Sequence, residues 1–206
     1  MIAVIDYSAG NLQSVKNALN FINCEHIITS DPETITSADS VILPGVGAFG
    51  DAMAALNGTP GLAGSVRRAA LSGKPFLGIC LGLQLLFSSS EESPGVPGLC
   101  VFPGEIKKIP AGEGLKVPHI GWNSLYINRT SALLQGLGES PHFYFVHSYY
   151  LDTNHSDIIV AESSYGVPMG TLLQKGNIMA AQFHPEKSGK VGLRMLRNFI
   201  KIVEGK

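Results

Sequence analysis

Charged side chains are scarce in this sequence: they make up 15% of its 206 residues, and the formal net charge is −1. The basic residues form no run, so there is no electrostatic basis for binding nucleic acid or an anionic membrane. No apolar stretch approaches the roughly 18 residues of a membrane span. Apolar residues, at 45%, are nevertheless too frequent for a disordered chain. We therefore expect a globular protein.

Cysteine is also rare, and the three residues Cys24, Cys80 and Cys100 form no close pair. This spacing argues against a disulfide framework or a zinc knuckle and favours a reducing compartment. Residues 1–6 carry no basic leader and predict a strand rather than a signal peptide. We expect a cytoplasmic protein that needs neither a metal nor another cofactor.

The first half of the chain alternates strands and helices. Apolar strands are predicted at 2–5, 26–29, 41–43 and 76–79, and helices at 11–21 (capped by Asn11), 52–56, 62–71 and 81–87. Repeated strand–helix units with apolar, β-branched strands are typical of a parallel sheet covered by helices on both faces.

The second half has a different pattern. Glycine, proline and short apolar runs alternate from 93 to 118, and closely spaced strands follow at 124–127, 143–146, 158–162, 171–173 and 178–183 before a helix at 189–203. No repeat or low-complexity linker interrupts the chain. We predict one α/β domain over 1–206, in three layers, with a mostly parallel central sheet and a mixed or antiparallel C-terminal extension.

Gly78-Ile-Cys80-Leu-Gly82 follows a buried strand and opens a helix, which is the nucleophile-elbow pattern with cysteine in place of serine. A helix N-terminus favours a thiolate, and the amide of Leu81 points to where an oxyanion would form. The alternative is a buried structural cysteine beside two packing glycines. Cys24 and Cys100 lack this setting and are predicted to be packing residues.

His184-Pro-Glu186 stands at the end of the last apolar strand. Residues two apart in an extended chain share a face, and Pro185 favours the extended region for His184. Glu186 can therefore hold one imidazole nitrogen while the other faces a thiol, as in a nucleophile–base–orienter triad. The alternative is a strand-end histidine beside a surface glutamate.

Pro44-Gly-Val-Gly-Ala-Phe-Gly50 matches the G-x-G-x-x-G dinucleotide fingerprint, after a strand and before a helix. The acidic residue expected about 20 positions later is missing, although Arg67 and Arg68 leave an NADP interpretation open. The interpretation that we favour is an amide-rich loop that faces Cys80 and supplies a second oxyanion donor.

Together these motifs resemble the class I (triad) glutamine amidotransferases. The resemblance covers nearly the whole chain and is closest to one branch of that family. It includes Asp6-Tyr-Ser-Ala-Gly-Asn11, Pro44-Gly-Val-Gly47, Gly78-Ile-Cys-Leu-Gly-Leu-Gln84, Gly121-Trp-Asn123, Tyr144-Phe-Val-His-Ser-Tyr149 and His184-Pro-Glu-Lys-Ser188.

The resemblance implies hydrolysis of L-glutamine through a cysteine thioester, with ammonia delivered to a (β/α)8-barrel cyclase in a heterodimer of histidine biosynthesis. The residue roles that it implies are catalytic for Cys80, His184 and Glu186; oxyanion-stabilising for Val46, Gly47 and Leu81; substrate-binding for Gly45, Gln84, His147 and Ser148; and interfacial for Asn11, Trp122, Asn123 and Lys187. The alternatives are the glutaminase component of another triad amidotransferase such as vitamin B6 synthase, a generic cysteine hydrolase, or a nucleotide-binding protein.

Overall fold

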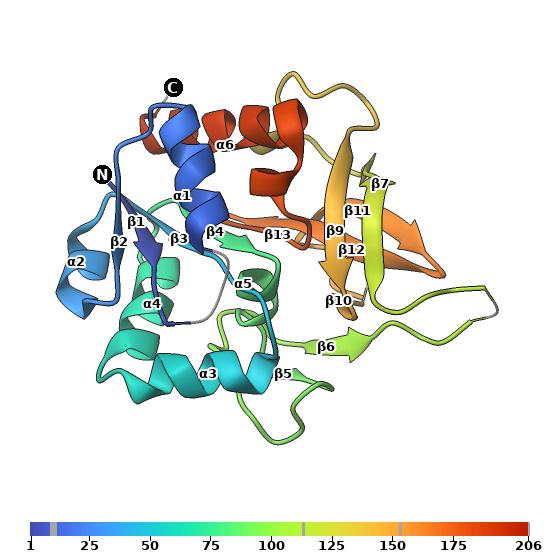
Figure 1. Cartoon of the computed structure of the whole chain (residues 1–206), viewed down its shortest axis with the longest axis horizontal. Coiled ribbons are helices and arrows are strands. Elements are labelled where there is room, and N and C mark those ends of the chain that lie inside the picture. The colour runs from blue at the N-terminus through green and yellow to red at the C-terminus, as the bar shows by residue number, and fades with distance from the viewer. Residues whose placement is uncertain (9–11, 113, 153, 206) are drawn as a thin grey trace.

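The computed structural model describes residues 1–8, 12–112, 114–152 and 154–205, and Figure 1 shows a large central sheet between helices. The helices are α1 (Leu12–Phe21), α2 (Pro32–Ser37), α3 (Phe49–Gly58), α4 (Leu62–Leu71), α5 (Leu81–Gln84) and α6 (Gly189–Val203), with 3-10 helices η1 (Ala132–Leu134) and η2 (Pro185–Lys187). The strands are β1 (Ile2–Ile5), β2 (His26–Thr29), β3 (Ser40–Leu43), β4 (Phe76–Ile79), β5 (Ser89–Ser90), β6 (Glu105–Lys108), β7 (His119–Ser124), β8 (Tyr126–Ile127), β9 (His142–His147), β10 (Tyr149–Leu151), β11 (Ile159–Tyr165), β12 (Val167–Lys175) and β13 (Ile178–Ala181).

The main sheet has the strand order β2-β1-β3-β4-β13-β12-β10-β6-β5. Neighbours from β2 to β13 are parallel, whereas β13–β12, β12–β10 and β10–β6 are antiparallel. In Figure 1, α1 and α6 cover one face and α3 and α4 the other. The predicted α/β fold class, with its antiparallel extension from the second half, is confirmed.

Two apolar cores lie on the two faces of the parallel strands, because successive strand side chains point to opposite sides. Ile2 and Val4 of β1 pack in the core that contains Val15 of α1 and Leu196 of α6. Ala3 and Ile5 pack in the other core, with residues of α2, α3 and α4. Burial on both faces leaves the carboxyl ends of the strands as the edge at which a site can open.

The helix predicted at 81–87 is wrong in length, since α5 ends at Gln84. The carbonyl groups of Leu85 and Leu86 accept hydrogen bonds from the amides of Leu99 and Val101, each at 2.8 Å. These bonds replace the ones that would have continued the helix. The apolar side chains of 85–87 are nevertheless buried, which is why the helical pattern extended too far.

Several short elements were not predicted from the sequence. They are α2, β5, β6, β10 and the two 3-10 helices η1 and η2. The strand predicted at 124–127 covers β8 but only the last residue of β7. Strand β7 pairs with β9 in a separate two-stranded sheet. The predicted cap at Asn11 lies outside the described residues. Among the helices that the structure describes, none is long and apolar enough to cross a membrane.

Candidate active site

Cys80 lies at the carboxyl end of β4 and precedes the first residue of α5. Its backbone has φ +54° and ψ −109°, in a region that non-glycine residues rarely occupy. The turn is this tight because glycine stands on both sides of it. A Cβ on Gly82 would lie 1.9 Å from the Leu43 carbonyl oxygen, and one on Gly78 would lie 2.9 Å from the Gly82 oxygen. The strained turn therefore projects the thiol from the sheet edge, as the elbow pattern predicts.

His184 and Glu186 form a buried ion pair next to this elbow. His184 Nδ1 lies 2.7 Å from Glu186 Oε1, and the two side chains are 1% and 2% exposed. His184 is extended, with φ −105° and ψ 93°, and η2 begins at Pro185. Among the described residues, His184 Nε2 has no hydrogen-bond partner. The pair thus leaves the second imidazole nitrogen for a proton-bearing group.

The pKa of His184 is raised from 6.5 to about 9. Burial by itself would lower it, but interactions with Cys80 and Glu186 outweigh this desolvation. At neutral pH the imidazole therefore carries a positive charge. A cysteine, a charged imidazole and a carboxylate in this order can transfer a proton and activate sulfur as a nucleophile.

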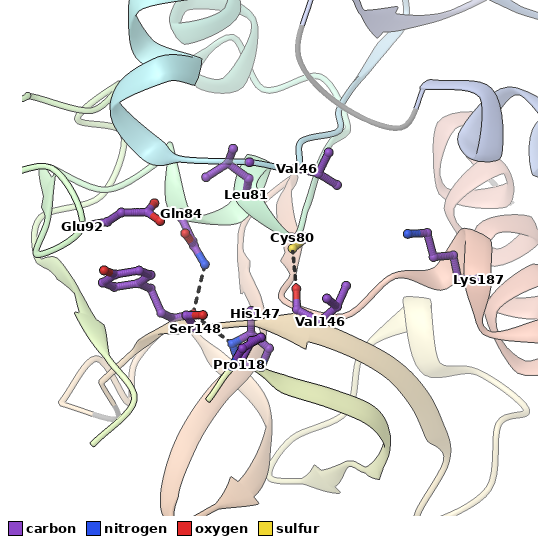
Figure 2. Close-up of a pocket in the computed structure, with 12 residues that line it drawn as sticks. Val46, Cys80, Leu81, Gln84, Glu92, Pro118, Val146, His147, Ser148 and Lys187 are labelled. Carbon is purple, nitrogen blue, oxygen red and sulfur yellow. Dashed lines mark hydrogen bonds between the residues drawn. The ribbon is translucent and has the colours of Figure 1, made fainter. Parts of the chain in front are cut away.

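A cavity of about 470 Å³ opens above the thiol. Figure 2 shows Cys80 in its middle, with Glu92 and Lys187 on opposite sides. Its lining comprises Val46, Gly47, Cys80, Leu81, Gln84, Glu92, Pro118, Val146, His147, Ser148, Tyr149 and Lys187. His184 and Glu186 do not line it, so Cys80 is the member of the three that meets a ligand.

The glycine-rich loop between β3 and α3 forms part of this cavity. Val46 and Gly47 line it, as expected of oxyanion donors, whereas Gly45 does not. Gly45 is held at the loop base, where an added Cβ would lie 2.5 Å from the Tyr7 hydroxyl oxygen. That hydroxyl donates to the Pro44 carbonyl at 2.9 Å. Gly47 has φ +99°, and no atom lies within 4 Å of an added Cβ. The loop is therefore closely packed at Gly45 and loosely packed at Gly47.

The predicted substrate-binding residues Gln84, His147 and Ser148 all line the cavity. Gln84 Nε2 donates to the Tyr149 carbonyl at 3.0 Å, and His147 Nδ1 lies 2.9 Å from the same oxygen. His147 Nε2 is 3.1 Å from Nδ1 of the buried His119. Desolvation lowers the pKa of both histidines to about 4, so both are neutral and hold the wall by hydrogen bonds.

Glu92 was missed by sequence reasoning. Among the described residues that line the cavity, it is the one carboxylate. Glu92 Oε2 accepts the Phe49 amide hydrogen at 2.7 Å and so caps α3, whose N-cap residue Ala48 has no side-chain cap. No local motif marks Glu92, which reaches the site because the segment after β5 returns to the start of α3.

Of the predicted interface residues that the structure describes, one lines the cavity and two belong to β7. Lys187 lines the cavity, and Trp122 is 57% exposed. Asn123 is only partly buried and donates to the Ser164 carbonyl at 3.0 Å. Asn11 lies outside the described residues.

The remaining cysteines differ from each other. Cys24 is buried, as predicted, but the prediction that Cys100 is a packing residue is wrong, because this side chain is exposed. Cys100 lies between β5 and β6, at φ +50°. In the part of the chain that the structure describes, no group of His, Cys, Asp and Glu could hold a metal ion.

Comparison with known proteins extends these observations over the whole chain. Residues 3–203 match the family model "Glutamine amidotransferase class-I". The chain is 53% identical to imidazole glycerol phosphate synthase subunit HisH of Methanothermobacter thermautotrophicus, over 98% of this chain and 99% of that one. It is 50% identical to the protein of the same name from Moorella thermoacetica, over 98% and 95% of the two chains.

Solved structures agree on the fold. One titled "Crystal structure of glutamine amidotransferase" matches with a TM-score of 0.76 at 20% identity, covering 99% of this chain and all of that one. Another, titled "Structure of PurLQS from Thermotoga maritima", matches with a TM-score of 0.72 at 19% identity, covering 98% of each chain. At this identity the likeness concerns the fold alone.

Proposed function

Because the chain belongs to the class I glutamine amidotransferases, we propose that it hydrolyses L-glutamine to L-glutamate and ammonia as the glutaminase subunit of an imidazole glycerol phosphate synthase. One observation carries this proposal. Cys80, unlike His184 and Glu186, lines a cavity, and Glu92 and Gln84 line the same cavity. The whole chain, 1–206, acts as one glutaminase domain.

Catalysis begins with the Cys80 sulfur attacking the side-chain amide carbon of glutamine. His184 takes up the thiol proton as the sulfur attacks, and its raised pKa favours the charged imidazole. His184 then returns this proton to the departing nitrogen, so that the C–N bond breaks and ammonia leaves. Water attacks the resulting thioester, with His184 as the base, and glutamate is released. Glu186 orients the imidazole throughout.

The negative oxygen of the tetrahedral intermediate needs two donors near Cys80. The Leu81 amide lies at the start of α5 and directly follows Cys80, which places it next to the reacting carbon. The Val46–Gly47 part of the loop supplies the second donor. Its glycine at φ +99° permits backbone angles that other residues avoid. A donor of this kind contributes about 10²–10³ in rate.

Recognition of glutamine is assigned to the cavity wall. Glu92 pairs with the α-ammonium group, since no other carboxylate lies among the described lining residues. The NH2 group of Gln84 donates to the Tyr149 carbonyl and to Gln182 Oε1. Its side-chain oxygen is therefore left to accept a hydrogen bond from the substrate. Gly45 acts indirectly, by keeping the loop base close to α5.

Ammonia is delivered to a partner protein with a (β/α)8 barrel, the cyclase that makes imidazole glycerol phosphate and aminoimidazole carboxamide ribotide. The exposed side chains of Ile120 and Trp122 lie on one face of β7, because they are two residues apart in a strand. Across the strand pair, Trp122 opposes Tyr144 and Ile120 opposes Val146 of the cavity lining. This apolar strip therefore reaches Val146 in the cavity lining, and the same lining includes Cys80 and Lys187.

The proposal is tested by mixing the purified chain with the cyclase of an imidazole glycerol phosphate synthase and measuring glutamate release. We expect hydrolysis of glutamine but not of asparagine, and formation of imidazole glycerol phosphate from glutamine. The matched control replaces the cyclase with the synthase component of vitamin B6 synthase. Equal activation by that component would contradict the assignment to histidine biosynthesis, and hydrolysis of amides in general would indicate a generic cysteine hydrolase.

A further inference from the structure

A row of side-chain amides leads from the cavity wall to the back of the reactive sulfur. Gln182, two residues before His184, is completely buried. Its Nε2 atom donates to Cys80 Sγ at 3.7 Å, and its Oε1 atom accepts from Gln84 Nε2 at 3.1 Å. Gln182 does not line the cavity, and the reaction steps above leave it without a role.

The direction of this row is set by one backbone carbonyl. The Tyr149 oxygen can only accept, so the group of Gln84 that faces it at 3.0 Å must be the NH2. The same nitrogen faces Gln182, which must then present its oxygen. The NH2 of Gln182 is left to point at Cys80. His147 Nδ1 donates to the same carbonyl at 2.9 Å and so helps to fix its position.

We propose that Gln182 is a positioning residue that donates a hydrogen bond to the Cys80 sulfur and stabilises its thiolate form, with the direction of the bond imposed by Gln84. This inference deepens the proposed function and rests on it. Hydrogen bonds to charged acceptors are stronger than those to neutral ones, so the bond favours the state in which the thiol proton has moved to His184.

The arrangement links substrate recognition to the nucleophile. Gln84 contacts the cavity on one side and Gln182 on the other, so a ligand that repositions the Gln84 amide alters the donor behind Cys80. Both glutamines are buried, at 4% and 0% exposure, which prevents water from replacing a lost donor.

The test is the pH dependence of Cys80 alkylation by iodoacetamide, between about pH 6 and pH 9, on the full chain. It needs no glutamine hydrolysis, so its failure is distinguishable from failure of the proposed function. A Cys100→Ser background removes the exposed thiol. The variants are Gln182→Met, which keeps the length but removes the donor, and Gln182→Glu, which keeps the shape and offers acceptors. Gln174→Met, in β12 and outside the cavity lining, is the control.

We expect alkylation at pH 7 to be on the order of threefold to tenfold slower in both Gln182 variants, with the midpoint of the rate–pH curve moved to higher pH. Gln84→Met should shift the curve in the same direction, and the double variant should shift it no further than the larger single change. A purely structural role would leave the curve in place. Folded Gln182 variants that follow the parent curve would overturn the proposal, and if neither folds, an unshifted Gln84→Met would do so.

Discussion

His184 Nδ1 and Glu186 Oε1 lie 2.7 Å apart at side-chain exposures of 1% and 2%, on the two sides of a proline that starts a 3-10 turn. Water screens such a buried pair only weakly, so the carboxylate fixes the orientation of the imidazole and, together with Cys80, raises its pKa. In the proposed mechanism Glu186 transfers no proton, since it occupies Nδ1 and leaves Nε2 for proton transfer. The mechanism therefore assigns the two residues unequal contributions to catalysis.

Glu186→Gln should reduce kcat/KM less than His184→Ala does. Loss of the imidazole removes proton transfer and should cost about 10²–10⁴ in rate. The amide in Glu186→Gln can still hold Nδ1 with its oxygen, but it no longer stabilises the positive charge. Steady-state glutamate release on variants of verified fold measures both effects, and equal or reversed losses would contradict the assigned roles.

The pH dependence follows from the raised pKa of His184, about 9. In the proposed mechanism the protonated imidazole supplies the proton for ammonia release, so kcat should fall as the pH rises through about 9. In Glu186→Gln this alkaline limb should move to lower pH, because one of the interactions that raise the pKa is lost. A pH–rate profile of each protein measures the shift, and coincident alkaline limbs would rule out the carboxylate as its cause.

The same pKa has a consequence for stability. A folded-state pKa raised above the ordinary 6.5 means that the folded protein holds the proton more tightly than the unfolded chain does. The contribution is fully present below about pH 6.5 and is lost as the pH rises through about 9. Urea unfolding across this range should show the free energy of unfolding falling less steeply in Glu186→Gln than in the parent. A steeper fall in the variant would contradict the linkage.

The sequence predicted the parallel strands and the elbow well because their signals are local. β4 and α6 have the predicted ends, and Cys80 directly follows β4 as expected. The last strand is shorter than predicted, since β13 ends at Ala181 and His184 lies in the turn before η2. The parts that were missed depend on contacts between distant segments. Glu92 enters the cavity through a returning loop, and α5 ends early because Leu85 bonds to Leu99.

Gln182 shows the same limit in another form. Its neighbours Phe183 and His184 make the motif visible, yet a glutamine in a buried strand end carries no signal of its own. Its partners Gln84 and Cys80 come from another segment, and only the fold shows that an amide faces the sulfur. The short α2 was predictable, since Asp31 before Pro32 is a strong N-terminal signal that accepts from Thr34 at 2.9 Å.

The packing of α6 against η2 predicts a sensitive glycine away from the cavity. A Cβ on Gly192 would lie 1.8 Å from the Pro185 carbonyl oxygen, so Gly192→Ala must push α6 or the His184–Glu186 segment aside. We expect a loss of about 1–3 kcal/mol of stability, together with a fall in kcat. Gly58→Ala, with nothing within 4 Å of the added Cβ, is the matched control and should change stability by less than about 0.5 kcal/mol. Indistinguishable melting curves for the two variants would contradict this packing.

The exposed strip on β7 predicts how the partner is bound. Trp122→Ala should weaken cyclase binding by more than about tenfold, because an exposed aromatic residue is a frequent hot spot. Phe21→Ala, at a side chain 69% exposed on α1, is the control and should bind normally. Calorimetric titration measures the affinity. Unchanged binding by Trp122→Ala would place the interface elsewhere.

Coupling between partner and chemistry is expected in the 45–47 loop. Its fixed base and unencumbered Gly47 allow the peptide at the tip to turn, so the isolated chain should hydrolyse glutamine slowly and accelerate when the cyclase binds. Lys187→Ala should reduce this acceleration while leaving Cys80 open to alkylation. Full activity of the isolated chain would contradict the coupling but not the triad.

The most direct test of the central claim is glutamate release by Cys80→Ala in the presence of the cyclase. Cys24→Ala and Cys100→Ala serve as controls, since neither side chain reaches the cavity. We predict that Cys80→Ala folds and binds the cyclase but releases no glutamate above background, whereas both controls keep nearly full activity. The cyclase in that mixture should still form product from ammonium salt. Glutamate release by Cys80→Ala at a rate near that of the parent protein would contradict the account.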